Sequence, residues 1–551
     1  MEPISGKTPS AYEFPLLIKH ILKAPIDYRR DQEIVYRDSK RFTYREFHER
    51  VARLATALTE LGIKKGDTVA VMDWDSNRYL ECYFAIPMIG AVMHMINMRL
   101  APEQLIYTID HAEDQLILVH RDFVPLIQSI KGRIAGVKRF VLMNDWEANR
   151  PPAQGIEFSG EYEELLAKAA PMEEYPDFDE NTRATTFYTT GTTGLPKAVF
   201  YTHRQLVLHT MGATATLASI RSGPGFHGED VYMPITPMFH VHAWGIPYVA
   251  TFLGVKQVYP GKYVPDMLNS LIEKEKVTFS HCVPTILAML LKDPSAKGMD
   301  WSKWKVVIGG AALPKALAAM ALGMGIDIFA GYGMSETCPF VSIDRLTRED
   351  LARAHEEQLE KRTRTGTAIG LMYLRVIDPK GNDVKRDNKS AGEIVLRAPW
   401  LTMGYYKDAK NSEKLWEGGW MHTQDVAVMN DDRSVRITDR LKDVVKVGGE
   451  WLSSLEMEDI LASQGEIEEV AVIGLPDEKW GEIPLACVVQ RAEAELTAHK
   501  VMEHVKGYVD RGVLPREAIL LRVQFVDAID KTSVGKTDKL ALKAKYASAK
   551  A

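Results

Sequence analysis

Along the first third of the chain, apolar residues alternate between helical spacing and short β-prone runs. Between residues 44 and 62 they recur every three or four positions. These positions are Phe47, Val51, Leu54, Ala55, Leu58 and Leu61, with Gly62 suited to a C-cap. Further helices are expected near 78–90 and after 101–104, with strands at 68–72, 91–95 and 115–119. Helices that alternate with short buried strands predict α/β units around a largely parallel sheet.

The second half of the chain has a different texture. From about residue 369, short strands separated by many turns predict a β-rich subdomain, and residues 456–508 alternate between helix and strand patterns typical of a small α+β domain. The polar stretch 145–181, rich in Pro, Glu, Asp and Gly, is expected to be a surface connection. We therefore predict an α/β fold. Residues 1–439 would form a large N-terminal domain of α/β sheet layers with the β-rich subdomain, and residues 440–551 a small mobile α+β domain.

Composition narrows the class of protein. The 551 residues exceed what one hydrophobic core usually supports, so two or more domains are expected. A net charge of −6 gives no sign of a general nucleic-acid or membrane surface. The most apolar run, residues 84–97, is too short to span a bilayer, so no stable membrane insertion is expected. Four widely separated cysteines and the absence of a signal-peptide pattern predict a reduced, cytoplasmic protein.

The strongest chemical signal is the stretch YTTGTTGLPK at residues 188–197. Glycines let successive backbone N–H groups point one way, and threonine hydroxyls and a lysine add donors for phosphate. The candidate ligands are Thr189, Thr190, Gly191, Thr192, Thr193, Gly194 and Lys197. The spacing is not that of a Walker A loop. A polar hairpin turn without function is the alternative, but such a turn rarely needs so many hydroxyls.

Several later segments carry weaker signals. His240 and Trp244 lie in an aromatic stretch that suits either a core or an apolar substrate pocket. Gly309, Gly310 and Ala311 follow a predicted strand, where small residues let a flat ligand approach the backbone. The segment 331–337 places glycines on both sides of a tyrosine. Its residues are Gly331, Tyr332, Gly333, Met334, Ser335, Glu336 and Thr337.

Three candidates lie in the last quarter of the chain. Asp425 is expected at a strand end, where a carboxylate can accept both hydroxyls of a ribose. Residues 438–443 are almost all polar or charged, and suit a solvated turn or a hinge. Near the C-terminus, Lys536 beside Gly535 sits in a basic loop that can reach into a neighbouring site, although basic tails are usually only solubilising.

Together, these motifs closely resemble those of the adenylate-forming superfamily of acyl-CoA synthetases, adenylation domains and luciferases, over nearly the whole chain and in the family's order. Residues 238–244 (MFHVHAW) and 446–454 (KVGGEWLSS) are most similar to medium- and long-chain fatty acyl-CoA synthetases. The resemblance implies an AMP-forming acid–CoA ligase. A carboxylate attacks the α-phosphate of Mg·ATP to give acyl-adenylate and diphosphate, and the thiol of coenzyme A then displaces AMP.

The resemblance also implies roles in nucleotide binding. The loop 189–197 would hold the β- and γ-phosphates, and Tyr332 within the segment 331–337 would stack on adenine. Asp425 would bind the ribose, and Arg440 would lie beside the ribose and phosphates. Thr192 and Glu336 would position Mg²⁺.

The remaining roles concern catalysis, the hinge and the acyl pocket. By resemblance, Lys536 bridges the carboxylate and the α-phosphate during adenylation, and Lys442 is the hinge about which the small domain turns. That rotation would withdraw Lys536 and bring residues 446–451 to the site for thioester formation. Lys536, Lys446 and His240 are the catalytic candidates. The pocket candidates are His240, Trp244, Gly309, Gly310, Ala311 and Trp451, the last as a gate.

Two positions depart from the family pattern, and several alternatives stay open. Ala198 replaces the glycine that usually follows Lys197, and Gln424 replaces the glycine that usually precedes Asp425. The substrate would be a medium- or long-chain fatty acid, or else an aryl, alicyclic or other short acid. The acceptor could be a carrier-protein thiol, the reaction could run towards ATP, and a degenerate nucleotide- or acyl-binding protein is the non-enzymatic alternative. The oligomeric state is open, with homodimers common among relatives.

Overall fold

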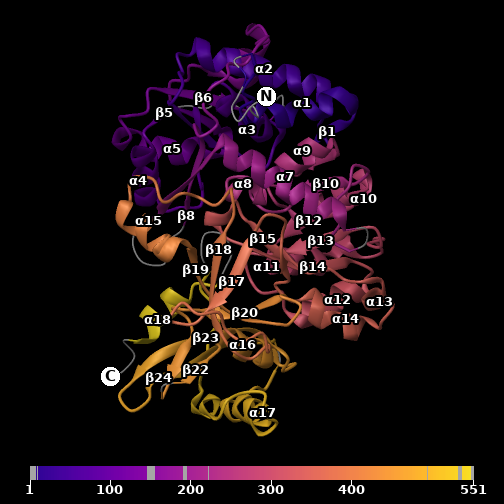
Figure 1. Cartoon of the computed structure of the whole chain (residues 1–551), viewed down its shortest axis with the longest axis vertical. Helices are drawn as coiled ribbons and strands as arrows, with labels where there is room; N and C mark the ends of the chain where they lie inside the picture. Colours follow the sequence, from indigo (N-terminus) through magenta and orange to yellow (C-terminus); the bar gives the residue numbers. More distant parts are fainter. Residues whose placement is uncertain are drawn as a thin grey trace, which may run out of the picture.

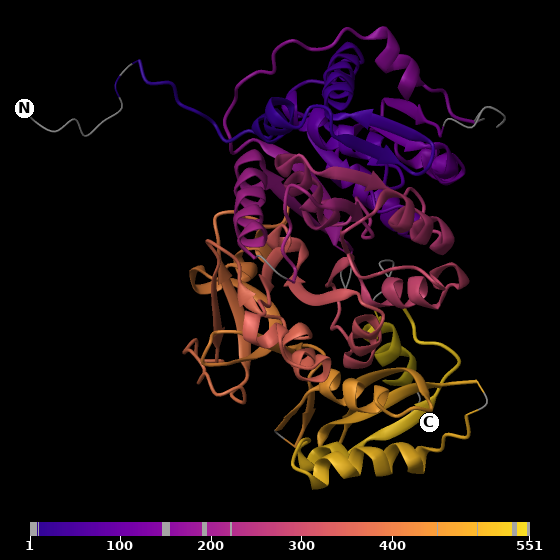
Figure 2. The same ribbon diagram turned by 90° about the vertical axis from the view of Figure 1, so that its right-hand side faces the viewer.

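In the computed structural model, a large N-terminal domain and a small C-terminal domain follow each other along the longest axis (Figure 1). The structure describes residues 8, 10–145, 155–189, 195–220, 223–448, 450–492, 494–531 and 537–547, without the side chains of 450, 451 and 547. Turning the molecule by 90° shows the β-rich subdomain in orange beside the large domain and the small domain in yellow beneath it (Figure 2). The predicted α/β fold with two domains is confirmed.

The first sheet of the large domain has the strand order β7-β6-β5-β3-β4-β8-β9. Its strands are β3 (Thr68–Met72), β4 (Val92–Met95), β5 (Asp114–His120), β6 (Arg139–Met143), β7 (Gly160–Glu161), β8 (Arg183–Thr189) and β9 (Lys197–Thr202). Neighbours are parallel except β8 and β9, which form an antiparallel hairpin at one edge. The strands expected at 68–72, 91–95 and 115–119 are therefore present, within one or two residues.

The second sheet has the order β16-β15-β14-β13-β12-β10-β11-β1-β2. Its strands are β1 (Glu33–Tyr36), β2 (Lys40–Thr43), β10 (Val231–Pro234), β11 (Lys256–Tyr259), β12 (Phe279–Cys282), β13 (Lys305–Ile308), β14 (Asp327–Gly333), β15 (Phe340–Ile343) and β16 (Thr367–Ala368). The run from β1 through β11, β10, β12 and β13 to β14 is parallel. The first two strands of the chain thus complete a sheet whose other members lie some two hundred residues later.

Helices cover and separate these two sheets. They are α1 (Lys19–Tyr28), α2 (Tyr44–Glu60), α3 (Asn77–Met88), α4 (Pro102–Ala112), α5 (Val124–Ile130), α6 (Tyr162–Lys168), α7 (His203–Ser219), α8 (Val241–Trp244), α9 (Ile246–Leu253), α10 (Pro265–Glu275), α11 (Pro284–Lys292), α12 (Lys315–Gly323), α13 (Arg348–Leu351) and α14 (His355–Arg362). A further helix, α15 (Ala409–Leu415), packs against the β-rich subdomain. All twelve residues of α3 are buried, because it touches β3, β4 and β8 of the first sheet and β1 of the second. Within the described residues, no helix combines the length and apolar character needed to cross a bilayer.

Local sequence explains where the long helices begin. Thr43 starts α2 with a capping box, in which its side chain accepts from the N–H of Glu46 and the Glu46 side chain accepts from the N–H of Thr43. Thr202 makes the same reciprocal pair with Gln205 at the start of α7. Each box satisfies backbone donors that have no partner within the helix.

The β-rich subdomain and the small domain each have their own antiparallel sheet. The subdomain consists of β17 (Tyr373–Ile377), β18 (Gly392–Arg397), β19 (Met421–Met429) and β20 (Val435–Arg440). The small domain contains β21 (Val445–Val447), β22 (Glu450–Leu452), β23 (Ile467–Asp477), β24 (Gly481–Gln490), β25 (Arg522–Phe525), α16 (Ser454–Ala462), α17 (Ala498–Asp510) and α18 (Lys539–Ala547). Among the described strands of the small domain, only β25 pairs in parallel, with β24.

Three expectations are corrected. Residues 145–181 are not only a surface connection, because they contain β7 and α6, and Tyr162 at the start of α6 is fully buried against Glu81. Only residues 441–443 of the range 438–443 form a turn, in which Lys442 is exposed, because β20 runs to Arg440 and Asp439 is buried. Asp425 lies inside β19 rather than at its end. In each case a tertiary contact overrides the local polar pattern.

Candidate active site

A cleft with a cavity volume of about 1290 Å³ lies between the large and small domains. Its walls include the C-terminal ends of the parallel strands β12, β13 and β14, which is where ligands bind in open α/β sheets. Most of the predicted site residues line this one cleft. They are Thr189, Lys197, His240, Trp244, Gly309, Gly310, Ala311, Gly331, Tyr332, Gly333, Met334, Ser335, Glu336, Asp425, Arg440 and Lys442. Thr337, at the end of the 3-10 turn Ser335–Thr337, is buried behind them.

Tyr332, Asp425 and Arg440 form one hydrogen-bonded group on the cleft wall. The hydroxyl of Tyr332 donates to Oδ2 of Asp425 at 2.6 Å, and Nε of Arg440 lies 3.1 Å from Oδ1 of the same carboxylate. Asp425 and Arg440 are direct cross-strand partners in β19 and β20, which explains why residues fifteen positions apart meet. Because the guanidinium of Arg440 is half exposed, it can also face an anion in the cleft.

Glu336 supplies a buried carboxylate beside this group. Its Oε1 accepts a hydrogen bond from the hydroxyl of Tyr405 at 2.8 Å, and the ammonium of Lys197 lies 4.8 Å from the centre of the Tyr405 ring. Burial raises the pKa of the Glu336 carboxyl, while the Tyr405 hydroxyl and nearby cations oppose the shift. In the described part of the chain, no cluster of three or more His, Cys, Asp or Glu side chains could hold a metal by itself.

The glycine- and threonine-rich stretch joins β8 to β9. Thr189 and Lys197 are the last paired residues of this hairpin, and both face the cleft. Thr190, Gly191, Thr192, Thr193 and Gly194 lie outside the described residues. Ala198 is an ordinary strand residue opposite Tyr188, and its carbonyl accepts from the N–H of Tyr406 at 2.9 Å. The alanine that replaces the usual glycine therefore causes no backbone strain.

A left-handed turn forms the wall of the cleft near His240. Val241, His242, Ala243 and Trp244 have φ values of 47°, 59°, 45° and 61°, and Gly245 continues at 70°. Each such non-glycine residue costs roughly 1–2 kcal/mol. The turn is held in place by its surroundings, since His242 Nε2 lies 2.8 Å from the hydroxyl of Thr185 and a Cβ on Gly245 would lie only 2.6 Å from the His209 ring.

The turn places Trp244 across the pocket. Its indole stacks on the imidazole of His281, with ring centroids 4.9 Å apart and planes inclined by 27°. A Cβ on Gly309 would lie 2.9 Å from Cη2 of Trp244, so glycine is needed there for the indole to fit. Trp244 and His240 also line a side cavity of about 70 Å³, whose wall includes Arg99 and Tyr263.

The small domain contributes residues on both sides of the basic loop to the cleft. Lys531 and residues 537–540, which flank the basic loop, line the cleft, whereas Lys446 is exposed on β21 and its N–H donates to Glu482 at 2.8 Å. Trp451 is the cross-strand partner of Lys446. Lys536 and the side chain of Trp451 lie outside the described residues.

A mostly buried lysine fixes the segment after the basic loop. Nζ of Lys539 donates to Oγ of Ser454 at 2.6 Å and lies 2.7 Å from Oε1 of Glu458. The carboxylate of Asp439, at the end of β20, accepts from the N–H of Ser454. Burial alone would lower the pKa of Lys539, but the attraction of Glu458 and then Asp439 raises it. This group, Asp439, Ser454, Glu458 and Lys539, is called the lysine cage below.

Sequence reasoning missed several residues of the site. Tyr405 holds Glu336, His281 supports Trp244, and the lysine cage joins the two domains. Tyr405 was detectable only as a tyrosine after Gly404 in a turn-rich segment. His281 and Lys539 carried no local signal, because their partners are between 37 and 85 residues away.

Gln424 occupies a backbone position that favours glycine. Its φ is +60°, its N–H donates to Glu393, and its carbonyl accepts from Leu441. We expect Gln424→Gly to raise the free energy of unfolding by about 0.5–1 kcal/mol, since relief of left-handed strain exceeds the entropy cost of glycine. Gln424→Val should lower it. Urea denaturation of the two variants checks this, and a less stable glycine variant would contradict it.

Comparison with known proteins gives consistent matches. Residues 23–406 match the family described as AMP-binding enzyme, and residues 456–536 match the AMP-binding enzyme C-terminal domain. A long-chain-fatty-acid–CoA ligase of Thermus thermophilus is 38% identical over 92% of this chain and 90% of its own length. A 3-methylmercaptopropionyl-CoA ligase of Ruegeria lacuscaerulensis is 35% identical over 97% of both. The crystal structure of the anthranilate CoA ligase AuaEII with anthranoyl-AMP superposes with a TM-score of 0.83, at 23% identity, over 98% of this chain and 99% of that one.

Proposed function

The chain belongs to the AMP-binding enzymes and is an AMP-forming acid–CoA ligase, and on this premise we propose that it activates a medium- or long-chain fatty acid. The observation that carries the proposal is the lining of the cleft beyond Tyr332. It is mainly apolar and comes from six different elements of the large domain, together with the turn before α8. The apolar residues are Leu217, Phe239, Val241, Trp244, Ile246, Phe279, Val307 and Phe340. A lining of this kind favours an alkyl chain.

In the proposed reaction, ATP binds with its adenine on Tyr332 and its ribose hydroxyls on Asp425. Arg440 lies beside the α-phosphate, and the loop 189–197, with Lys197, holds the β- and γ-phosphates. The support is the geometry of the hydrogen-bonded group and its place in the cleft. The fixed cross-strand pairing of Asp425 and Arg440 means that little reorganisation is needed when the nucleotide binds.

Magnesium fits the donors that the cleft offers. Glu336 would hold the ion together with Thr192 and the phosphate oxygens, because proteins usually bind Mg²⁺ through one or two carboxylates plus substrate phosphates. The bound ion would offset negative charge on the phosphates. Tyr405 keeps the Glu336 carboxylate oriented towards this position by its hydrogen bond to Oε1.

Bond changes follow in two steps. A carboxylate oxygen of the acid attacks the α-phosphorus, so an O–P bond forms and the bond to diphosphate breaks, with Lys536 placed between the two anions. The thiolate of coenzyme A then attacks the acyl carbon, a C–S bond forms and AMP leaves. We propose that the boundary between the large and the small domain lies between residues 439 and 440. The small domain then turns about Lys442, which removes Lys536 from the active site and brings Lys446 into it. The exposure of Lys446 away from the cleft supports this division of labour.

The test is the release of AMP, dependent on ATP and CoA, across a panel of acids. The panel runs from acetate through linear C4 to C16 acids to benzoate and cyclohexanecarboxylate. We expect kcat/KM to rise by about tenfold for every two methylenes until the pocket is filled, since each buried methylene contributes about 0.8 kcal/mol. A maximum at a ring acid, or no dependence on chain length, would overturn the fatty-acid proposal.

A second candidate is a short or aromatic acid. Trp244 favours it, because its indole closes over Gly309 and shortens the pocket in the present arrangement. The same panel separates the two, since a short acid would give its maximum before C6. Four free and buried cysteines support the proposed cytoplasmic location, and a homodimer is the proposed assembly.

A further inference from the structure

The loop between β3 and α3 contains a carboxylate with no role in the chemistry above. Asp75 is 4% exposed, and its Oδ1 accepts a hydrogen bond from the N–H of Met238 at 2.9 Å. Its Oδ2 accepts from the hydroxyl of Tyr263, and its own carbonyl accepts from the N–H of Gly261 at 2.8 Å. The Asp75 side chain, in the loop after β3 of the first sheet, therefore binds two segments that follow strands of the second sheet.

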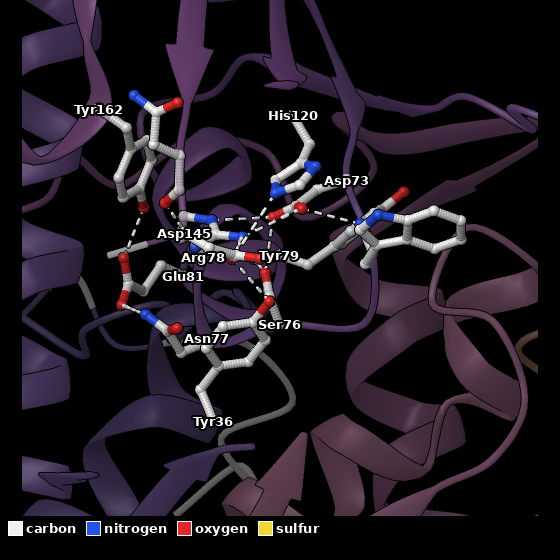
Figure 3. Close-up of polar contacts among 12 residues, drawn as sticks. Tyr36, Asp73, Ser76, Asn77, Arg78, Tyr79, Glu81, His120, Asp145 and Tyr162 are labelled. Atoms are coloured by element: carbon white, nitrogen blue, oxygen red, sulfur yellow. Dashed lines mark hydrogen bonds and ion pairs between the residues drawn. The ribbon is translucent and has the colours of Figure 1, made fainter. Parts of the chain in front are cut away.

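A buried ion cluster makes this loop rigid (Figure 3). Arg78, fully buried in α3, donates through Nε to Asp73 at 3.0 Å and through Nη2 to Asp145 at 3.2 Å. Asp73 also accepts from the hydroxyl of Ser76, which caps α3. The residues on both sides of Asp75 are thus fixed, so its carboxylate is pre-aligned on Met238.

The clamp on Met238 is two-sided. Its N–H is bound by Asp75, and its carbonyl accepts from the hydroxyl of Tyr83, which belongs to α3. Three residues later the chain enters the left-handed turn that carries Trp244. All four residues of the turn have the left-handed backbone that side chains disfavour, so fixed contacts at the start of the turn are needed to keep it formed.

We propose that Asp75 is a positioning residue for the acyl substrate, acting through the Met238 N–H to hold the turn that places His240 and Trp244 in the pocket wall. It does not touch the substrate and has no contact with the nucleotide group around Asp425. The inference rests on the proposed function only in that the pocket beside Trp244 receives the acid. It does not depend on which acid that is.

The environment of Asp75 predicts that binding of the acid depends on pH. Burial raises its pKa to about 7, against hydrogen bonds from Tyr263 and Met238 that lower it. The other titratable and charged groups that face it are Arg99, Asp73, Tyr79, Tyr83, Tyr232 and Tyr259. Above pH 7 the ionised carboxylate accepts the Met238 N–H strongly, and below pH 7 protonation weakens that bond. The KM for the acid should therefore rise as the pH falls through 7, while the KM for ATP does not follow it.

The experiment compares Asp75→Ala, Asp75→Asn and the control Glu81→Gln, using whichever acid of the panel reacts fastest. Asparagine keeps an oxygen for the Met238 N–H but cannot ionise. Glu81, in α3, is a buried carboxylate like Asp75, but its partners Arg50, Asn77 and Tyr162 are not in the cleft wall. We expect a tenfold or greater rise in the acid KM for Asp75→Ala with the ATP KM within twofold. Asp75→Asn should recover near-normal values without the pH dependence, and Glu81→Gln should change neither KM.

Hydrogen–deuterium exchange gives a readout that needs no activity. Peptides covering residues 237–245 should exchange at least tenfold faster in Asp75→Ala than in the parent or in Glu81→Gln, and Asp75→Asn should be protected. If the enzyme accepts none of the acids, the proposed function fails while this comparison still decides the inference. Equal exchange in all variants, or equal changes in both KM values, would overturn it. If Asp75→Ala does not fold, the inference would be overturned by finding the same pH dependence of the acid KM in Asp75→Asn as in the parent.

Discussion

Replacing Lys536 with alanine is expected to slow formation of the acyl-adenylate by about 10²–10³-fold, the usual cost of removing one donor aimed at developing charge. Conversion of preformed acyl-adenylate and CoA to product should stay within threefold of the parent rate. The reason is that Lys536 is proposed to lie between the carboxylate and the α-phosphate only in the first half-reaction. The segments flanking it, Lys531 and residues 537–540, line the cleft, and Lys531 forms an isolated β-bridge with Thr537.

The measurement is diphosphate–ATP exchange for the first half-reaction and thioester formation from synthetic acyl-adenylate for the second. Lys545→Ala is a matched control, because this exposed lysine of α18 is outside the cleft and should leave both rates unchanged. Equal loss of both half-reactions in Lys536→Ala would contradict the proposed exchange of lysines about Lys442.

The second large effect is on stability. Lys539→Met should destabilise the small domain and its attachment by about 3 kcal/mol, the lower end of what loss of one partner costs in a buried ion pair. Methionine keeps the volume of the side chain but leaves Glu458 and Asp439 without a countercharge. Burial already raises the pKa of both carboxyls, so ionising them unpaired is unfavourable. The loss is measured as the difference in unfolding free energy between variant and parent, obtained by chemical denaturation.

The double variant Lys539→Met/Glu458→Gln provides the control for that explanation. It removes the unpaired charge as well as the lysine, so it should recover at least half of the stability lost in the single variant, because neutral replacement of a buried pair is often well tolerated. A single variant as stable as the parent, or a double variant no better than the single one, would show that the lysine cage carries no net interaction.

The secondary structure and the active site of this protein differ in how much of each the sequence alone predicts. The helix at 44–60 and the strand at 68–72 follow from apolar spacing and from Gly62 just after the helix, all of which lie within a few residues. The grouping of Tyr332, Asp425 and Arg440 in one cleft agrees with the family resemblance. Their hydrogen bonds depend on the pairing of β19 with β20, which no local pattern specifies.

Other features were beyond local reasoning because distant contacts create them. The left-handed turn Val241–Trp244 contains a β-branched residue, and local propensity argues against it. Residues 145–181 look like a loop in the sequence, because the contact that holds Tyr162 in place is made with Glu81, far back in the chain. His281 and Lys539 become important only once the sheet and the domain contact exist. Local sequence specifies the elements, and tertiary packing specifies most of the site.

The early strands β1 and β2 have a practical consequence for dividing the gene. A fragment that begins after β9 would lack them, and β11 would then end its sheet with unpaired backbone groups, a template for aggregation. Such a fragment should be insoluble unless residues 33–43 are supplied in trans or fused to it. A cut between β20 and β21 crosses no sheet, since β21 to β25 pair only among themselves in the described residues. We therefore expect two separately produced pieces that meet at this junction to assemble into an active enzyme.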